Sequence, residues 1–80
     1  MPYILEYINE FSDRRYLGTF DTHKVAIAAM VADLTSYQIE PYYYRTWMVN
    51  DNTERIDYGS HSRFYEITEV KDQIQNKDGD

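Results

Sequence analysis

Four side chains of types that occur in hydrolase active sites lie together in the segment DYGSHS, residues 57–62. They are Asp57, Ser60, His61 and Ser62. A serine nucleophile needs a base within hydrogen-bond reach and an acid that orients this base. Neighbours on one strand or turn rarely achieve that geometry, whereas Asp, Ser and Gly are common turn residues and Gly59 can adopt a positive φ. The pattern therefore favours a hydrogen-bonded turn, with a small enzyme built around His61 as the alternative.

Metal, cofactor and phosphate chemistry have no clear signature either. The two histidines, His23 and His61, lack the HxxxH or HxH spacing of paired metal ligands, and the chain has no cysteine. No glycine-rich loop of the phosphate-binding type is present. No pair of carboxylates lies in an apolar setting that would shift a pKa. We therefore predict no catalytic residue, no cofactor and no metal site.

The charge balance narrows the classes of partner. Eight basic residues stand against 14 acidic ones, which gives a net charge of −6. Nucleic-acid affinity depends mainly on Lys and Arg neutralising phosphates, and anionic membranes attract the same residues. The longest apolar run, residues 25–32, is far too short to span a membrane. With no cysteine and no signal-peptide pattern, we expect a cytoplasmic protein that binds neither membranes nor, by preference, nucleic acid.

The elements that must position these residues can be read from periodicity. Residues 3–8 and 15–20 have the composition of two strands of a hairpin, with Gly18 suggesting either a bulge or a place where the helix packs close. Residues 20–38 predict a helix capped by Asp21 or Thr22. Its apolar stripe consists of Ile27, Met30, Val31 and Leu34, at i, i+3, i+4 and i+7.

The second half of the chain predicts further strands. Residues 42–49 form the strongest strand pattern, and residues 54–59 and 63–70 follow after turn signals. We predict an α+β fold with the order ββαββ, or with its last strand split near Gly59. It has two layers, an antiparallel sheet and one helix packed on one face. The domain covers residues 1–70, and residues 71–80 are expected to be a disordered polar tail.

The run EPYYYRTWMV, residues 40–49, decides the functional interpretation. Alternation puts Tyr42, Tyr44, Thr46 and Met48 on one face of a strand and Tyr43, Arg45, Trp47 and Val49 on the other. We expect Trp47 and Val49 to pack with the helix, which leaves the first set on the open face. Tyr58 joins that set, so the predicted interaction face consists of Tyr42, Tyr44, Thr46, Met48 and Tyr58.

Three uses of such a face remain open. Tyrosines make good cross-strand pairs and tolerate partial exposure, so the face can be purely structural. Tyr, Trp, Met and Arg are also enriched at interface centres, which fits a protein partner or a homodimer. Base stacking on single-stranded nucleic acid needs a basic surround, such as Arg45, Arg55, Arg63 and Lys24 gathered on one face.

Residues 16–67 resemble a group of short, uncharacterised proteins from Gram-positive bacteria and their phages. The resemblance is carried by GTFDTHKVAIAAMVADL and YYYRTWMVNDNTERIDYGSHSRFYEI, and above all by an IDYGSHxxFY-like ending. It implies no activity. We expect a small protein-binding or homodimerising module, in one version a phage-type accessory or inhibitor protein whose acidic surface mimics nucleic acid. The alternatives are a single-stranded nucleic-acid-binding sheet and a structural domain with no activity of its own.

Overall fold

The computed structural model of the chain describes residues 2–39, 45–60 and 62–70. In chain order the elements are β1 (Tyr3–Ile8), β2 (Arg14–Phe20), α1 (His23–Ser36), β3 (Arg45–Met48), β4 (Thr53–Asp57) and β5 (Phe64–Glu69). The α+β class is confirmed. The predicted order ββαββ is one strand short. The observed order is that of the alternative, in which the last strand is split near Gly59: this residue has a φ of 108°, and β4 and β5 form separately on either side of it. The predicted tail at residues 71–80 lies outside the described residues.

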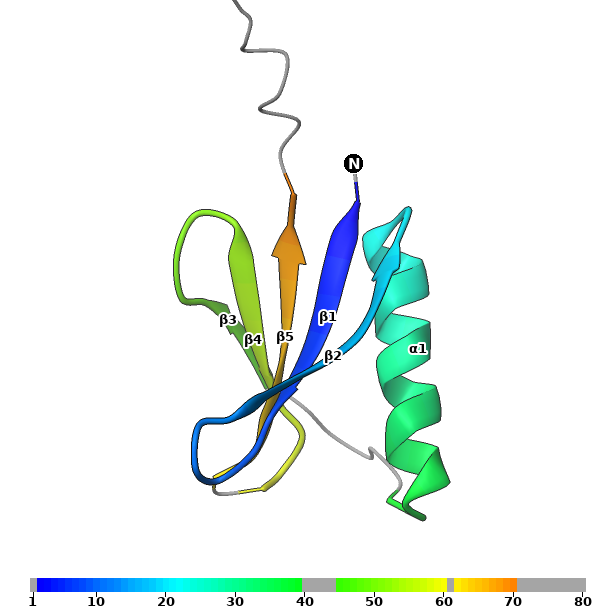
Figure 1. Cartoon of the computed structure of the whole chain (residues 1–80), viewed down its shortest axis with the longest axis vertical. Coiled ribbons are helices and arrows are strands. Elements are labelled where there is room, and N and C mark those ends of the chain that lie inside the picture. The colour runs from blue at the N-terminus through cyan, green and yellow to red at the C-terminus, as the bar shows by residue number, and fades with distance from the viewer. Residues whose placement is uncertain (1, 40–44, 61, 71–80) are drawn as a thin grey trace, which may run out of the picture.

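The five strands form one antiparallel sheet in the order β2-β1-β5-β4-β3. The last strand, β5, lies in the middle between β1 and β4, so the two ends of the described chain share the centre of the sheet. The helix α1 lies on one face (Figure 1). This arrangement confirms the two layers predicted for the domain.

The helix begins and ends where local chemistry allows. The Thr22 hydroxyl oxygen accepts a hydrogen bond from the Val25 N–H at 3.1 Å, so Thr22 is the N-cap rather than Asp21. At the other end Gln38 has a φ of 62°, a left-handed conformation typical of helix termination. Within the described residues no helix has the length and apolar character needed to cross a membrane.

The row of the helix that faces the sheet consists of Ala26, Met30 and Leu34, all fully buried. Met30 and Leu34 were predicted, whereas Ile27 and Val31 are only half-buried at the sides of this row. Relative to the predicted stripe, the buried row therefore includes Ala26 and leaves Ile27 and Val31 at its side. A small alanine at its start lets the helix backbone lie close to the strands.

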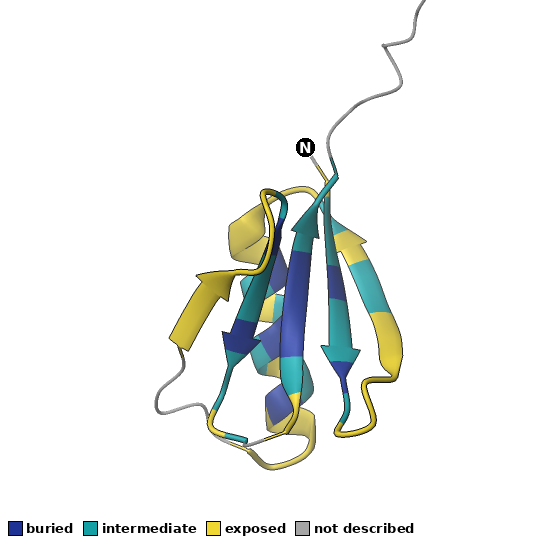
Figure 2. Ribbon diagram, turned by 90° about the vertical axis from the view of Figure 1, so that its left-hand side faces the viewer, coloured by how far each residue is buried: buried dark blue, intermediate teal, exposed yellow. Residues whose placement is uncertain are grey.

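The core lies between this row and the inner face of the sheet. The sheet contributes Leu5, Ile56, Tyr65 and Ile67, each at most 2% exposed. The Tyr65 hydroxyl donates a hydrogen bond to Asp33 of the helix at 2.6 Å, which ties the two layers together. Figure 2 shows the sheet from the face opposite the helix, with the buried segments concentrated in its central strands.

The edge strand β2 contains the bulge that Gly18 suggested. Leu5 pairs with Gly18, and the next residue, Glu6, pairs with Tyr16, so Leu17 is the extra residue. Gly18 has a φ of 153°, and a Cβ at this position would lie only 2.8 Å from the Phe20 ring. The prediction of a bulge at this glycine is confirmed.

Candidate functional site

The segment DYGSHS forms the hydrogen bonds of a turn. The Asp57 carboxylate accepts from the Gly59 N–H at 2.8 Å and from Arg45 at 3.1 Å. The Ser60 hydroxyl oxygen accepts from the N–H groups of Ser62 and Arg63 at 3.4 and 3.2 Å. These contacts match the predicted hydrogen-bonded turn, and His61 lies outside the described residues.

His23, the other histidine, lies at the start of α1. Its Nε2 atom is 2.7 Å from the carboxylate of Glu54, and its ring meets Tyr3 edge-on at 5.9 Å between centroids. The described residues contain no group of three or more His, Cys, Asp or Glu side chains placed to hold a metal ion. His23 thus links the helix to β4 through one polar contact.

A cleft of about 340 Å³ lies between the C-terminal end of α1 and the sheet, and composition alone did not reveal it. Its lining is rich in tyrosine: Tyr7, Glu10, Leu34, Tyr37, Ile39, Tyr58, Arg63 and Tyr65. Burial raises the pKa of Tyr58 to about 12. Burial, followed by the hydrogen bond to Asp33, raises the pKa of Tyr65 as well. Both hydroxyls are therefore protonated at neutral pH and suit packing more than proton transfer.

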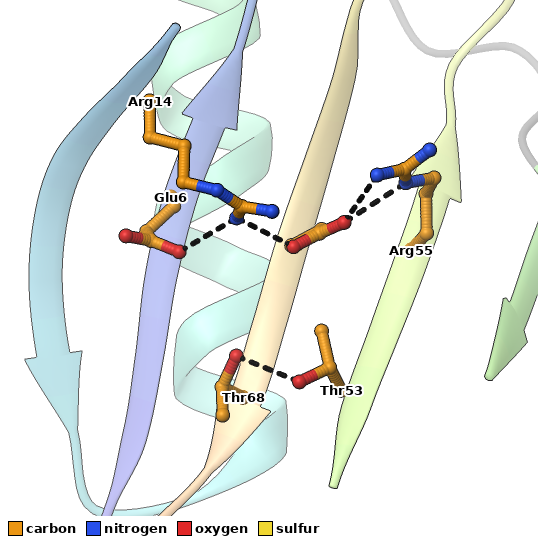
Figure 3. A network of polar contacts seen from close by, with 6 residues as sticks. Glu6, Arg14, Thr53, Arg55 and Thr68 are labelled. Atoms are coloured by element: carbon orange, nitrogen blue, oxygen red, sulfur yellow. Dashed lines mark hydrogen bonds and ion pairs between the residues drawn. The ribbon is translucent and has the colours of Figure 1, made fainter. Parts of the chain in front are cut away.

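The face of the sheet opposite the helix carries a buried carboxylate, Glu66, which is only 2% exposed. It accepts a hydrogen bond from Arg14 at 2.7 Å and two from Arg55 at 2.9 and 2.7 Å. Arg14 also reaches Glu6 at 3.0 Å (Figure 3). Arg14 on β2, two strands away, and Arg55 on the neighbouring strand β4 thus neutralise and cover a charge at the centre of this face. No local sequence pattern predicts this cluster, since its members lie on four different strands.

On the same face, opposite the helix, aromatic rings lie between the Glu66 cluster and β3. Trp47 and Phe64 meet edge-on at 6.2 Å between centroids. The guanidinium of Arg55 lies 5.1 Å from the centre of the Phe64 ring, and that of Arg45 lies 6.0 Å from the Trp47 ring. The contacts therefore run from Arg55 to Phe64, from Phe64 to Trp47 and from Trp47 to Arg45, so two touching rings have an arginine at each end.

The predicted side for Trp47 is wrong. Trp47 pairs with Arg55 and therefore lies on the face opposite the helix, whereas Thr46 pairs with Ile56 of the core. Thr46 and Met48 are consequently on the helix side of the sheet, not on its open face. The reason is positional: α1 lies closest to β1, β2 and β5, so a ring on the distant strand β3 gains no helix contact on either side.

The members of the predicted interaction face have different surroundings. Thr46 and Met48 are exposed on β3. Tyr58 is half-buried against the core, with its ring 5.5 Å from that of Tyr65. Tyr42 and Tyr44 lie outside the described residues. Among the described members, Thr46 and Met48 therefore share a strand, and Tyr58 contributes to packing.

The strand β3 is an edge of the sheet, and among the described strands its only neighbour is β4. The Val49 N–H donates to the Thr53 carbonyl at 2.9 Å. Hydrogen-bonded and non-hydrogen-bonded pairs alternate along an antiparallel ladder, so Trp47, two residues earlier, also turns its backbone groups toward β4. The N–H and C=O groups of Thr46 and Met48 then point away from β4, to the outer side of the edge.

The two edges of the sheet differ in how well they are protected against pairing with a strand of another chain. The edge strand β2 has the bulge and begins with Arg14 and Arg15, and both features discourage pairing with another chain. The pairing of β3 with β4 is regular, and every residue of β3 is exposed (Figure 2). Trp47, Met48 and Val49 expose 40%, 58% and 43% of their surface. The edge at β3 thus combines outward backbone groups with apolar side chains.

The carboxylates form local pairs on both faces and at both ends of the described fold. Those within 3.7 Å of a cationic or histidine nitrogen are Glu6, Glu10, Asp33, Glu54, Asp57 and Glu66. The pairing of Glu10 with Arg63 lowers the pKa of Glu10. Among the described residues, these six acidic side chains are therefore spread over both faces of the sheet and the helix, each with a neighbouring cationic or histidine nitrogen.

Comparison with protein-family models, with curated proteins and with solved structures gives no match to the chain. The fold and the geometry of its edges are thus the observations that bear on function.

Proposed function

We propose that the chain is a protein-binding module without catalytic activity, and that its partner docks on the edge strand β3. The partner is another protein or a second copy of the chain. The observation that carries this proposal is the contrast between the two edges of the sheet. A bulge interrupts the edge strand β2, whereas β3 has a regular register, is exposed along its whole length and presents apolar side chains.

The outward groups of Thr46 and Met48 supply the main-chain part of such binding. An extended segment that pairs with an exposed edge gains main-chain hydrogen bonds for affinity, and alternate side chains give specificity. Trp47 supplies an anchor on one face and Met48 on the other. Trp is among the residue types enriched at energetic centres of interfaces, and Met is enriched in interfaces generally.

The distribution of charge favours this function over nucleic-acid binding. Arg45 and Arg55 do lie near Trp47 and Phe64, but each already contacts a carboxylate, Asp57 or Glu66. Arg63 belongs to a different cluster, where it bonds with Glu10. Phosphate binding would have to break such pairs first. The same local pairing gives no support to the version in which an acidic face mimics nucleic acid.

The experiment compares capture by the wild-type chain with capture by an edge variant, Thr46→Pro. Proline removes an N–H that points outward, so the isolated fold loses no hydrogen bond, whereas strand addition loses a donor and meets the ring. Thr46→Val keeps the N–H and serves as the matched control. Circular dichroism checks that all three chains are folded.

We expect the wild-type chain and Thr46→Val to retain the same partners, including untagged copies of the chain, and Thr46→Pro to lose them. A partner counts only if its binding also slows amide exchange at Thr46 and Met48. Retention of every partner by a folded Thr46→Pro would overturn the proposal.

A further inference from the structure

The geometry of β3 points to a second copy of the chain as the partner, and we propose that two β3 strands pair antiparallel about a two-fold axis. This inference rests on the proposed function, since it identifies what occupies the same edge. The result is one continuous sheet made from both copies, with the axis passing by Trp47. Such an interface is isologous, because each copy presents the same patch to the other.

The register follows from which backbone groups point outward. Thr46 and Met48 are the residues of β3 with outward groups, so they must form the hydrogen-bonded pairs between copies. If Thr46 of one copy faces Met48 of its partner, the reverse pair forms by symmetry and all of these groups are satisfied. Trp47 then faces the partner's Trp47 as a non-hydrogen-bonded pair on the axis. In the other symmetric register, Thr46 would face Thr46 of the second copy. Met48 would then face a position that precedes the described strand of that copy.

The side chains agree with this register. Directly opposed residues share a face, so both Trp47 rings lie on the face opposite the helices, where aromatic cross-strand pairs stabilise a sheet. Each ring is already held by Phe64 and by Arg45 of its own copy, at 6.2 and 6.0 Å. Less ordering entropy is therefore lost on association. The helix stays clear because it packs over β1, β2 and β5, at a distance from β3 (Figure 1).

Charge also favours a second copy over a strongly charged segment. Residues 46–49 are uncharged, and Arg45 at the start of β3 is paired with Asp57. An acidic or basic segment would thus find no unpaired counter-charge within residues 45–49. In the proposed register the two Arg45 side chains start about 13 Å apart along the strands, beyond the screening length of roughly 8–10 Å at physiological salt.

The area available sets the strength of the association. A four-residue edge covers less than the roughly 800 Å² per partner of a standard stable interface. We therefore expect a weak dimer that dissociates on dilution. The net charge of −6 on each copy opposes association at long range, so added salt should strengthen the dimer.

A cysteine experiment tests the register, since the chain has no cysteine of its own. In Trp47→Cys the two Cα atoms would lie about 4.5 Å apart across a non-hydrogen-bonded pair, within the range of a disulfide. In Thr46→Cys they would lie about 8 Å apart, because the two residues are offset along the strands, and this exceeds the disulfide range. Under mild oxidation at high protein concentration, we expect Trp47→Cys to form a covalent dimer at least about tenfold faster than Thr46→Cys.

Light scattering on the wild-type chain provides the second readout, because Trp47→Cys also removes the ring. We expect the mean mass to rise with concentration and with salt, and Thr46→Pro to remain monomeric. Equal cross-linking rates, faster cross-linking of Thr46→Cys, or a monomeric wild-type chain at every concentration would overturn the inference. The proposed function fails on a different result, namely full retention of foreign partners by Thr46→Pro.

Discussion

Replacing the buried carboxylate Glu66 tests how the face opposite the helix is stabilised. Glu66→Gln keeps the shape of the side chain but removes its charge. The amide oxygen can still accept from one guanidinium, whereas the amide N–H₂ group faces the other, so two donors oppose each other. Either Arg14 or Arg55 therefore loses its contact with the residue at this position.

The magnitude follows from the burial of the three partners. Breaking a fully buried ion pair costs about 3–5 kcal/mol. Here Glu66 is 2% exposed, but the side chains of Arg14 and Arg55 are 49% and 31% exposed, so water can replace part of what they lose. We expect a loss of about 2 kcal/mol in the free energy of unfolding. For a domain of this size that corresponds to about 8–16 °C in Tm.

Urea denaturation followed by circular dichroism, together with thermal melts, measures the loss. Glu10→Gln is the matched control, because Glu10 also bonds to an arginine, Arg63, at 2.9 Å, but does so in solvent. We expect its unfolding midpoint to stay unchanged within error. A loss below about 0.5 kcal/mol for Glu66→Gln would refute the reasoning, since the buried bonds would then be worth no more than bonds to water.

Three further outcomes are expected. Stability should fall as the pH rises from 10 to about 12, because the pKa of Tyr58 is raised to about 12 while an unfolded tyrosine deprotonates near 10. Urea titrations across this range should show a smaller fall for Tyr58→Phe, and an identical fall would contradict the assignment. Met30→Ala should cost about 2–5 kcal/mol, because Met30 is fully buried, whereas exposed Met48→Ala should stay within about 0.5 kcal/mol; similar losses would argue against the described core. Gly59→Ala should lower stability by about 1 kcal/mol or more because its φ is 108°, and an unchanged Tm would show that this turn tolerates a side chain.

The sequence was most informative where local patterns decide the structure. The strands around Ile4 and Ile67, the helix with Met30 and Leu34, and the turn at Gly59 all follow from periodicity and turn chemistry. These signals act over a few residues and do not depend on which strands are neighbours. They therefore predict the α+β class, but they leave open whether the last strand is split near Gly59, as it is in the structure.

The side of the sheet taken by Trp47 could not be predicted in the same way. Its bulk suggested burial against the helix, but that choice depends on how far β3 lies from α1, which only the strand order β2-β1-β5-β4-β3 determines. The Glu66 cluster has the same origin, because strand pairing brings Arg14, which is 52 residues away, beside it. Both features are consequences of topology rather than of local composition.

Amide hydrogen exchange at three consecutive residues of β3 tests the role of this edge most directly. In the dilute chain we expect Thr46 and Met48 to exchange fast and Trp47, whose N–H points toward β4, to exchange slowly. At high concentration, or with a bound partner, Thr46 and Met48 should slow while Trp47 serves as the internal reference. Slow exchange of Thr46 and Met48 in the dilute monomer, or fast exchange under every condition, would contradict docking at β3.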